Sequence, residues 1–148
     1  MFDTSKVGQS FPPFTIEIER GKIHEFALAI GDMNPIYHDR EAAQVAGYTD
    51  VPFFPTTPTI FWFWGNKELV DQLTSLGIDV MRILHSSEEY EYLATIYPGD
   101  RLSGITTVVE GKVRKGQAGS MEIVTFEINY TNQRGEHVLK ARETLIVR

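Results

Sequence analysis

Hydrophobic residues in the first half of the chain recur at the spacing of α-helices. Ile23, Phe26, Ala27 and Ile30 lie at positions i, i+3, i+4 and i+7, which places them on one face of a helix. Gly31 follows the last of them, where a helix commonly ends with a residue in the left-handed conformation. The spacing therefore predicts a helix that ends at residue 30. A second, short helix is predicted downstream.

That second helix begins after Asp39, a suitable N-cap, and ends before Gly47. A third helix is predicted over about residues 58–75, because Thr57-Pro58 supplies a cap followed by proline at the first helical position. Residues 60–64 are Ile-Phe-Trp-Phe-Trp, apolar on every side. A helix of this kind is expected to be enclosed by the rest of the protein.

The second half of the chain alternates apolar and polar residues with a period of two, which is typical of β-strands. Glycine-containing turns separate the alternating segments. Strands of this kind pair antiparallel, and their single apolar face needs a cover, for which the third helix is the candidate. The predicted fold class is α+β, a curved antiparallel sheet wrapped round one buried helix. The alternating segments are residues 90–96 (in a strand over 86–97), 123–130 and 139–147, with turns at 98–100, 115–116 and 132–135.

Composition narrows the class of protein. The 148 residues suit one domain, and they include no cysteine, which excludes disulfides, thiolate metal sites and a cysteine nucleophile. This composition fits a reducing cytoplasm. The longest apolar run is five residues, far short of the roughly 20 that a membrane-spanning helix needs. Residues 1–10 lack the basic start and apolar stretch of a signal peptide.

The net charge is −6, which argues against a nucleic-acid-binding surface. The charge is unevenly distributed, because residues 1–100 carry −9 and residues 101–148 carry +3. One interpretation is that two surfaces differ in their solvation. The other is a mildly basic patch for an anionic ligand, centred on Lys112, Arg114 and Lys115.

Between the first two predicted helices, four polar side chains lie within seven residues: Asp32, Asn34, Tyr37 and His38. Polar groups on a loop held by rigid neighbours often bind ligands or catalyse reactions. The structural alternative is that Asp and Asn cap the helices and that Asn34-Pro35 only makes a turn.

The sequence Gly31-Asp32-x-Asn34-Pro35 resembles the hydratase motif of the MaoC-like family. That resemblance implies a hotdog fold, and an activity of the (R)-specific enoyl-CoA hydratase or (3R)-hydroxyacyl-thioester dehydratase type. The run Asn-Pro-Ile-Tyr-His-Asp is similar to the branch called FAS1-like dehydratases. Further landmarks extend the resemblance over nearly the whole chain: residues 7–9 (Val-Gly-Gln), 46–48 (Ala-Gly-Tyr), 51–52 (Val-Pro), 55–58 (Pro-Thr-Thr-Pro) and 97–102 (Tyr-Pro-Gly-Asp-Arg-Leu).

The motif departs from the family pattern at one position. Active hydratases of the family carry histidine directly after the apolar residue, whereas this chain has Tyr37 there and His38 one residue later. Hydration of a 2-enoyl thioester needs a base that activates water and an acid that protonates the α-carbon, which an Asp/His pair supplies. Asp32 and Asn34 match the motif. Tyrosine, with an ordinary pKa near 10, is a poor base at neutral pH.

The enolate oxygen that develops on the thioester carbonyl needs hydrogen-bond donors, which the start of the third helix can offer. Pro58 lacks an N–H group, so the expected donors are those of Thr59 and Ile60. Phe54, with its neighbour Phe53, either lines an acyl channel or packs in the core. The resemblance implies that His85, at the entrance of a strand, lies near positions that face the substrate tunnel, and the alternative is a strand-end residue with a satisfied hydrogen bond. The remaining aromatic and histidine residues are expected to pack or to lie at the surface: Trp62 and Trp64, and His24 and His137.

Three functions remain open. The chain is a dehydratase or hydratase that acts through Asp32 and His38, or it is a non-catalytic acyl-binding subunit whose partner supplies the Asp/His pair, or it is a thioester-binding module without hydratase activity. The expected ligand is an acyl-CoA or acyl-carrier-protein thioester. A lone sheet leaves an exposed edge, so a homodimer or a heterodimer with a second hotdog chain is expected. No cofactor, metal or nucleic-acid partner is expected.

Overall fold

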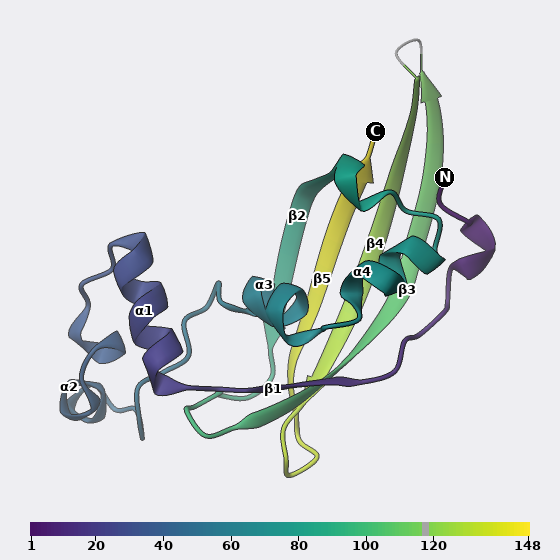
Figure 1. The fold of residues 1–148 in the computed structure, drawn as a ribbon. Helices are drawn as coiled ribbons and strands as arrows, with labels where there is room; N and C mark the ends of the chain where they lie inside the picture. The colour runs from purple at the N-terminus through teal and green to yellow at the C-terminus, as the bar shows by residue number, and fades with distance from the viewer. Residues whose placement is uncertain (117–118) are drawn as a thin grey trace.

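A computed structural model describes residues 1–116 and 119–148 of the chain. Five antiparallel strands form one curved sheet in the order β1-β3-β4-β5-β2 (Figure 1). This is the predicted α+β architecture. The strands are β1 (Phe14–Glu17), β2 (Ile83–Tyr92), β3 (Arg101–Gly116), β4 (Gly119–Thr131) and β5 (His137–Val147).

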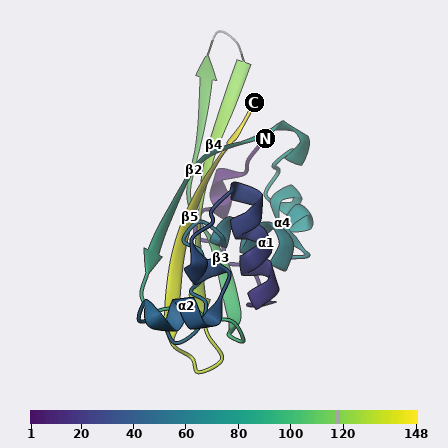
Figure 2. The same ribbon diagram turned by 90° about the vertical axis from the view of Figure 1, so that its left-hand side faces the viewer.

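Helical segments gather on one face of the sheet and at one end of it (Figures 1 and 2). The segments α3, η3 and α4 follow one another across the face of the strands. The helices α1 and α2 lie together to one side of the sheet (Figure 1). The helical segments are η1 (Thr4–Lys6), α1 (Arg20–Ile30), η2 (Pro35–Tyr37), α2 (Arg40–Val45), α3 (Pro58–Ile60), η3 (Phe61–Gly65), α4 (Leu69–Ser75) and η4 (Val80–Arg82).

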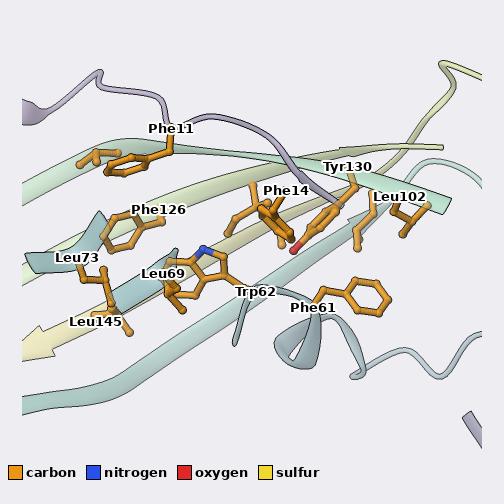
Figure 3. Close-up of a cluster of buried hydrophobic side chains, with 14 of the residues drawn as sticks. Phe11, Phe14, Phe61, Trp62, Leu69, Leu73, Leu102, Phe126, Tyr130 and Leu145 are labelled. Atoms are coloured by element: carbon orange, nitrogen blue, oxygen red, sulfur yellow. The ribbon is translucent and has the colours of Figure 1, made fainter. Parts of the chain in front are cut away.

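The hydrophobic core lies between this sheet face and the helical segments that cover it (Figure 3). On β4, the alternating residues Val124, Phe126, Ile128 and Tyr130 are all buried, as the period of two predicts. Trp62 packs on Phe126 with ring centroids 5.2 Å apart. The segment that carries Trp62 is therefore the cover that the sheet needs.

The predicted C-terminal end of α1 and the predicted N-cap of α2 are confirmed. Gly31 adopts the left-handed conformation with φ 76°, and its N–H bonds back to the last turn of α1. Asp39 caps α2 by accepting a hydrogen bond from the Ala42 N–H at 2.7 Å. Gly47 follows α2 with φ 97°, a conformation that side chains with a Cβ rarely adopt.

The prediction of one continuous helix over residues 58–75 is wrong. The segment is a short α-helical turn (α3), a π-helical turn (η3) and a separate helix (α4). Asn66 breaks it with a non-helical ψ of 89°, and its Oδ1 accepts a hydrogen bond from the Glu68 N–H at 3.3 Å. Gly65 lies so close to β1 that a Cβ there would come within 3.3 Å of Ile16. This close approach and the side-chain turn of Asn66 outweigh helix propensity.

The expected enclosure of residues 60–64 is also wrong. Phe61 and Trp62 are buried, but Phe63 is 46% and Trp64 is 79% exposed. The π-helical turn thus buries two of its aromatic rings and leaves the other two partly or largely exposed. Trp64 therefore does not pack in the core of this chain, whereas Trp62 does.

The strand predicted over residues 86–97 begins and ends earlier, as β2. The N–H groups of Leu93 and Ala94 both bond to the carbonyl of Val138, at 2.9 and 3.2 Å, which ends the regular ladder. Strand β3, the longest of the sheet, was not predicted as a strand. Its alternation is interrupted where the register with β4 shifts between Val108 and Glu110.

In the described part of the chain, strand β2 pairs only with β5, and no strand lies along its other edge. In the part of the chain that the structure describes, no helix combines the length and apolar character that crossing a membrane requires.

Candidate functional site

The polar loop after α1 is held by its own side chains. Asp32 Oδ1 accepts a hydrogen bond from the Asn34 N–H at 2.8 Å. Asn34 Oδ1 in turn accepts from the Ile36 N–H at 3.3 Å and caps η2, with Pro35 at its first position. Asp32 and Asn34 thus stabilise the turn and cap the helical segment, as expected if their role is structural. The same turn fixes where Tyr37 and His38 point.

His38 is turned away from the Asp32 carboxylate. Its Nε2 lies 2.7 Å from the Asp32 backbone carbonyl, to which it can only donate. Its Nδ1 lies 2.9 Å from Nδ1 of His24, with the rings nearly perpendicular at 86°. In a neutral ring that donates from Nε2, Nδ1 accepts, so His24 is the donor of this second bond. Both ring nitrogens of His38 therefore have partners, and neither partner is a carboxylate.

Tyr37, at the position of the family histidine, packs against Phe54 with ring centroids 4.7 Å apart. Burial raises the pKa of the Tyr37 hydroxyl, and the charges of Asp32 and Tyr48 raise it further. The hydroxyl therefore stays protonated at neutral pH and can donate a hydrogen bond but not act as a base. Phe54 also contacts Phe26 of α1, so it connects α1 to the loop.

An open cleft of about 430 Å³ adjoins this loop and the end of β2. Its walls are mostly aromatic and apolar, and Tyr92 closes one side by donating a hydrogen bond to the Pro55 carbonyl at 2.6 Å. Phe54 does not line it. The lining residues are Tyr37, Tyr48, Pro52, Phe53, Pro55 and Tyr92–Ile96.

The start of α3 offers fewer donors than expected. The Ile60 N–H already bonds to the Thr57 carbonyl at 2.9 Å, and Pro58 is buried. The Thr59 hydroxyl donates to the Glu88 carboxylate and lies 2.7 Å from the Tyr90 hydroxyl. The side chain of Thr59, one of the predicted carbonyl-binding residues, is thus hydrogen-bonded to side chains of β2.

A buried carboxyl pair that the sequence analysis missed underlies this network. Glu88 of β2 and Glu143 of β5 are directly paired across the ladder. Glu143 is 1% exposed, and burial together with the charge of Glu88 raises its pKa to about 8. The Nε2 of His85 lies 3.4 Å from Glu143 Oε1 and 3.8 Å from Glu88 Oε2.

A signal for Glu143 was present in the sequence. It occupies the inward position between Ala141 and Leu145 in the alternation of β5, where both neighbours are buried. A glutamate on the apolar face of a strand must be paired or neutral, and such groups cluster at functional sites.

The basic residues Lys112 and Arg114 are exposed on β3, toward the hairpin at the end of the sheet opposite α1 and α2 (Figure 1). Lys112 forms an ion pair with Glu110. The side chain of Lys115 lies outside the described part of the chain. These residues are thus not brought together with the loop of Asp32. Among the described residues, no group of three histidines, aspartates or glutamates could hold a metal ion.

Comparison with known proteins gives a family match over most of the chain. A sequence profile described as "FAS1-like, dehydratase domain region" matches residues 5–141. A UPF0336 protein of Streptomyces avermitilis is 38% identical over 147 residues, which cover 99% of this chain and 95% of that protein.

Solved structures confirm the hotdog fold. A chain of the C-terminally truncated HadBC (3R-hydroxyacyl-ACP dehydratase) complex from Mycobacterium tuberculosis superposes with a TM-score of 0.80 at 23% identity, covering 95% of this chain and 96% of that one. A chain of the ChsH1-ChsH2 complex from the same organism superposes with a TM-score of 0.70 at 18% identity, covering 93% and 88%.

Proposed function

Because the chain belongs to the FAS1-like dehydratase region family, a branch of the MaoC-like hotdog dehydratases, we propose that it is the acyl-binding subunit of a (3R)-hydroxyacyl-thioester dehydratase or 2-enoyl-thioester hydratase. In this proposal a second hotdog chain supplies the Asp/His pair that activates water. This chain binds the thioester and completes the site.

The observation that carries the proposal is the placement of His38. The hydratase reaction needs an imidazole that shares a water molecule with a carboxylate. Both ring nitrogens of His38 are instead bonded to the Asp32 carbonyl and to His24. Tyr37, which occupies the family position of the histidine, is held protonated by its burial. Among the described residues, the Asp32 carboxylate therefore has no imidazole partner.

The free edge of β2 supports a two-chain assembly. An unpaired edge is open to strand addition from another chain, and hotdog sheets of two chains can become continuous there. Two of the structural neighbours come from complexes of two differently named chains, HadBC and ChsH1-ChsH2. We therefore propose a heterodimer with a partner that carries histidine directly after Asn-Pro-apolar. A homodimer is the alternative assembly.

We place the acyl thioester between the loop of Tyr37 and the start of α3. The cleft of about 430 Å³ between the loop of Tyr37 and the end of β2 is mostly apolar, which suits an acyl chain. The Thr59 N–H would hold the thioester carbonyl, because Pro58 has no N–H and the Ile60 N–H already bonds to Thr57. Its carrier is CoA or an acyl-carrier protein.

A self-sufficient hydratase is the second candidate, and one observation favours it. Asp32 and Asn34 occupy their motif positions, and the charge of Asp32 contributes to the raised pKa of Tyr37. A swing of His38 away from His24 would then be needed to form the pair.

The deciding experiment measures hydration of crotonyl-CoA and longer 2-enoyl-CoAs. The purified chain is assayed alone and with a hotdog protein that carries the histidine, each with wild-type chain and with Asp32→Asn. Asparagine keeps the oxygen that accepts the Asn34 N–H, so the loop is preserved. Asp71→Asn, an exposed carboxylate on α4, is the matched control.

We expect binding but no turnover by the chain alone, turnover by the complex, and less than a threefold effect of Asp32→Asn in the complex. Turnover by the chain alone that Asp32→Asn abolishes would establish the self-sufficient enzyme. Thioester binding without turnover in any complex would indicate the binding module without hydratase activity.

A further inference from the structure

Buried polar atoms without hydrogen-bond partners gather around the start of α3. Among the described residues, these atoms are Thr57 Oγ1, Tyr130 Oη and Glu143 Oε1. Tyr130 is fully buried. Burial raises the pKa of its hydroxyl, and the charges of Glu143 and Glu88 raise it further. Figure 3 shows this hydroxyl directed from β4 toward the helical cover. Buried groups of this kind are rare and call for an explanation.

The carboxyl pair beneath α3 cannot hold two negative charges at low cost. Glu88 and Glu143 are directly opposite on β2 and β5, so their side chains share one face of the sheet. Glu143 is 1% exposed, and the Glu88 side chain is 14% exposed. Among the described residues, no lysine or arginine forms an ion pair with either carboxyl. One shared proton is the usual resolution of such a pair.

The hydrogen bonds of Thr59 connect this carboxyl pair to α3. The Thr59 hydroxyl donates its single proton to the Glu88 carboxylate. The Tyr90 hydroxyl, 2.7 Å from the same oxygen of Thr59, must then donate to it. In this arrangement Glu88 is the acceptor that fastens Thr59 to β2. Glu143 is the more buried of the two carboxyls and has the raised pKa, so it is the member of the pair that holds the proton.

That histidine is the connection to solvent. The Nε2 of His85 lies between the two carboxyls, while 43% of its side chain is exposed. An imidazole in this position is open to water on one side and faces the carboxyl pair on the other. The other polar and titratable groups that face the pair are Tyr90 and Tyr92 of β2, Tyr130 of β4 and Thr59 of α3.

We propose that His85, Glu88 and Glu143 form a proton-binding site in which the two carboxyls hold one proton, His85 exchanges it with solvent, and the singly charged pair fastens the first turn of α3 to β2 through Thr59. Loss of the proton puts two charges under α3 and weakens this attachment. Because α3 is where the thioester carbonyl is proposed to bind, thioester affinity becomes dependent on pH. Only this last step rests on the proposed function.

The site itself is tested on the free chain by NMR, with ¹³C-labelled glutamate and ¹⁵N-labelled histidine. We expect the Glu143 carboxyl to titrate near pH 8 and the His85 ring signals to respond at the same pH. In Glu143→Gln, which keeps the shape of the side chain, the His85 response near pH 8 disappears. His137, exposed at the start of β5, is the internal reference. A Glu143 signal that is fully ionised at pH 7 overturns the proposal.

The consequence is tested by calorimetric binding of octanoyl-CoA between pH 6.5 and 9. If binding needs the protonated pair, the dissociation constant rises toward tenfold for each pH unit above 8. Glu143→Gln, whose amide stays uncharged, should bind with little change over this range. Glu89→Gln, exposed on the same strand, is the matched control and should follow the wild type. Equal pH dependence in wild type and Glu143→Gln overturns the attachment through Thr59.

The two experiments separate the two proposals. A chain that shows the coupled titration but binds no thioester at any pH retains the proton site and contradicts the proposed function. A chain that binds thioester but lacks the coupled titration contradicts the proton site and leaves the proposed function standing.

Discussion

The Nδ1 atoms of His24 and His38 lie 2.9 Å apart, so the histidine of the hydratase-like motif is bonded to a second imidazole. Its other nitrogen bonds to the Asp32 backbone carbonyl at 2.7 Å. An imidazole with both nitrogens engaged holds the loop in place but has no free nitrogen for an attacking water. This arrangement leads to the first prediction.

His38→Gln should leave the turnover of the two-chain complex within about twofold of the wild type, because glutamine still offers an N–H to the Asp32 carbonyl. The variant should lose about 1 kcal/mol of stability, as expected for one or two hydrogen bonds. Steady-state kinetics of the complex and denaturant unfolding of the chain check both values. A loss of activity on the order of 100-fold would instead assign acid–base chemistry to His38.

Restoring the family histidine tests Tyr37 directly. Tyr37→His places an imidazole beside Asp32, and a general acid–base group typically contributes 10²–10⁴-fold. We expect the chain alone to gain at least about tenfold in crotonyl-CoA hydration, and the double variant with Asp32→Asn to lose that gain. Tyr37→Phe is the control, since it keeps the contact with Phe54. No gain in Tyr37→His would show that side chain 37 does not face the bound thioester.

The buried carboxyl predicts how stability depends on pH. Glu143 has its pKa raised to about 8 in the folded protein from an ordinary value of 4.5. The folded state therefore binds one more proton than the unfolded state between these values, so stability is full below pH 4.5 and falls as pH rises toward 8. Glu143→Gln should resemble the wild type at pH 5 and exceed it at pH 9, by on the order of a few kcal/mol.

Thermal unfolding of wild type, Glu143→Gln and Glu89→Gln at pH 5, 7 and 9 measures this difference. The Glu89→Gln control should follow the wild type, because its side chain is exposed on the same strand. Parallel curves for all three proteins would refute the raised pKa of Glu143.

Close packing at the sheet predicts a contrast between two glycines. A Cβ at Gly104 would lie 2.6 Å from Phe14 and 2.8 Å from Tyr130, two rings that pack edge to face. Gly104→Ala should cost about 1–3 kcal/mol of unfolding free energy. Gly21→Ala, in α1 with no atom within 4 Å of the added Cβ, should be neutral or gain up to about 1 kcal/mol. Denaturant unfolding tests both, and a neutral Gly104→Ala would contradict the packing.

Sequence patterns predicted those parts of the fold that depend only on neighbouring residues. The alternation of β4 and the caps at Gly31 and Asp39 are local, so the sequence alone specified them. The break at Asn66 was not predictable in this way, because it depends on how closely Gly65 approaches β1.

The candidate site likewise has parts that local sequence predicted and parts that depend on tertiary structure. The loop of Asp32 was found from its residues and family resemblance. The direction of His38 depends on His24, which lies 14 positions away in the sequence, and the pairing of Glu88 with Glu143 depends on strand register. Each of these is a tertiary relationship that no local pattern carries. A glutamate on the apolar face of β5 was the one sequence signal for the buried pair.

The role of Lys112 and Arg114 remains a prediction that charge reversal can decide. They are exposed near the β3–β4 hairpin, and Lys112 is already paired with Glu110. If they bind the phosphates of CoA, Lys112→Glu with Arg114→Glu should weaken octanoyl-CoA binding by about tenfold or more at low salt, where surface charges are least screened. The N-acetylcysteamine thioester of the same acid has no phosphate, so its affinity should not change.

The double variant Lys22→Glu with Lys67→Glu is the control, because it makes the same change in net charge at other exposed positions. It separates a local contact from a general loss of attraction for anions. Equal weakening of octanoyl-CoA binding by both double variants would leave no specific role for Lys112 and Arg114. Their position opposite the loop of Asp32 means that a specific effect would require the bound thioester, or that of a partner chain, to extend along the sheet toward the hairpin (Figure 1).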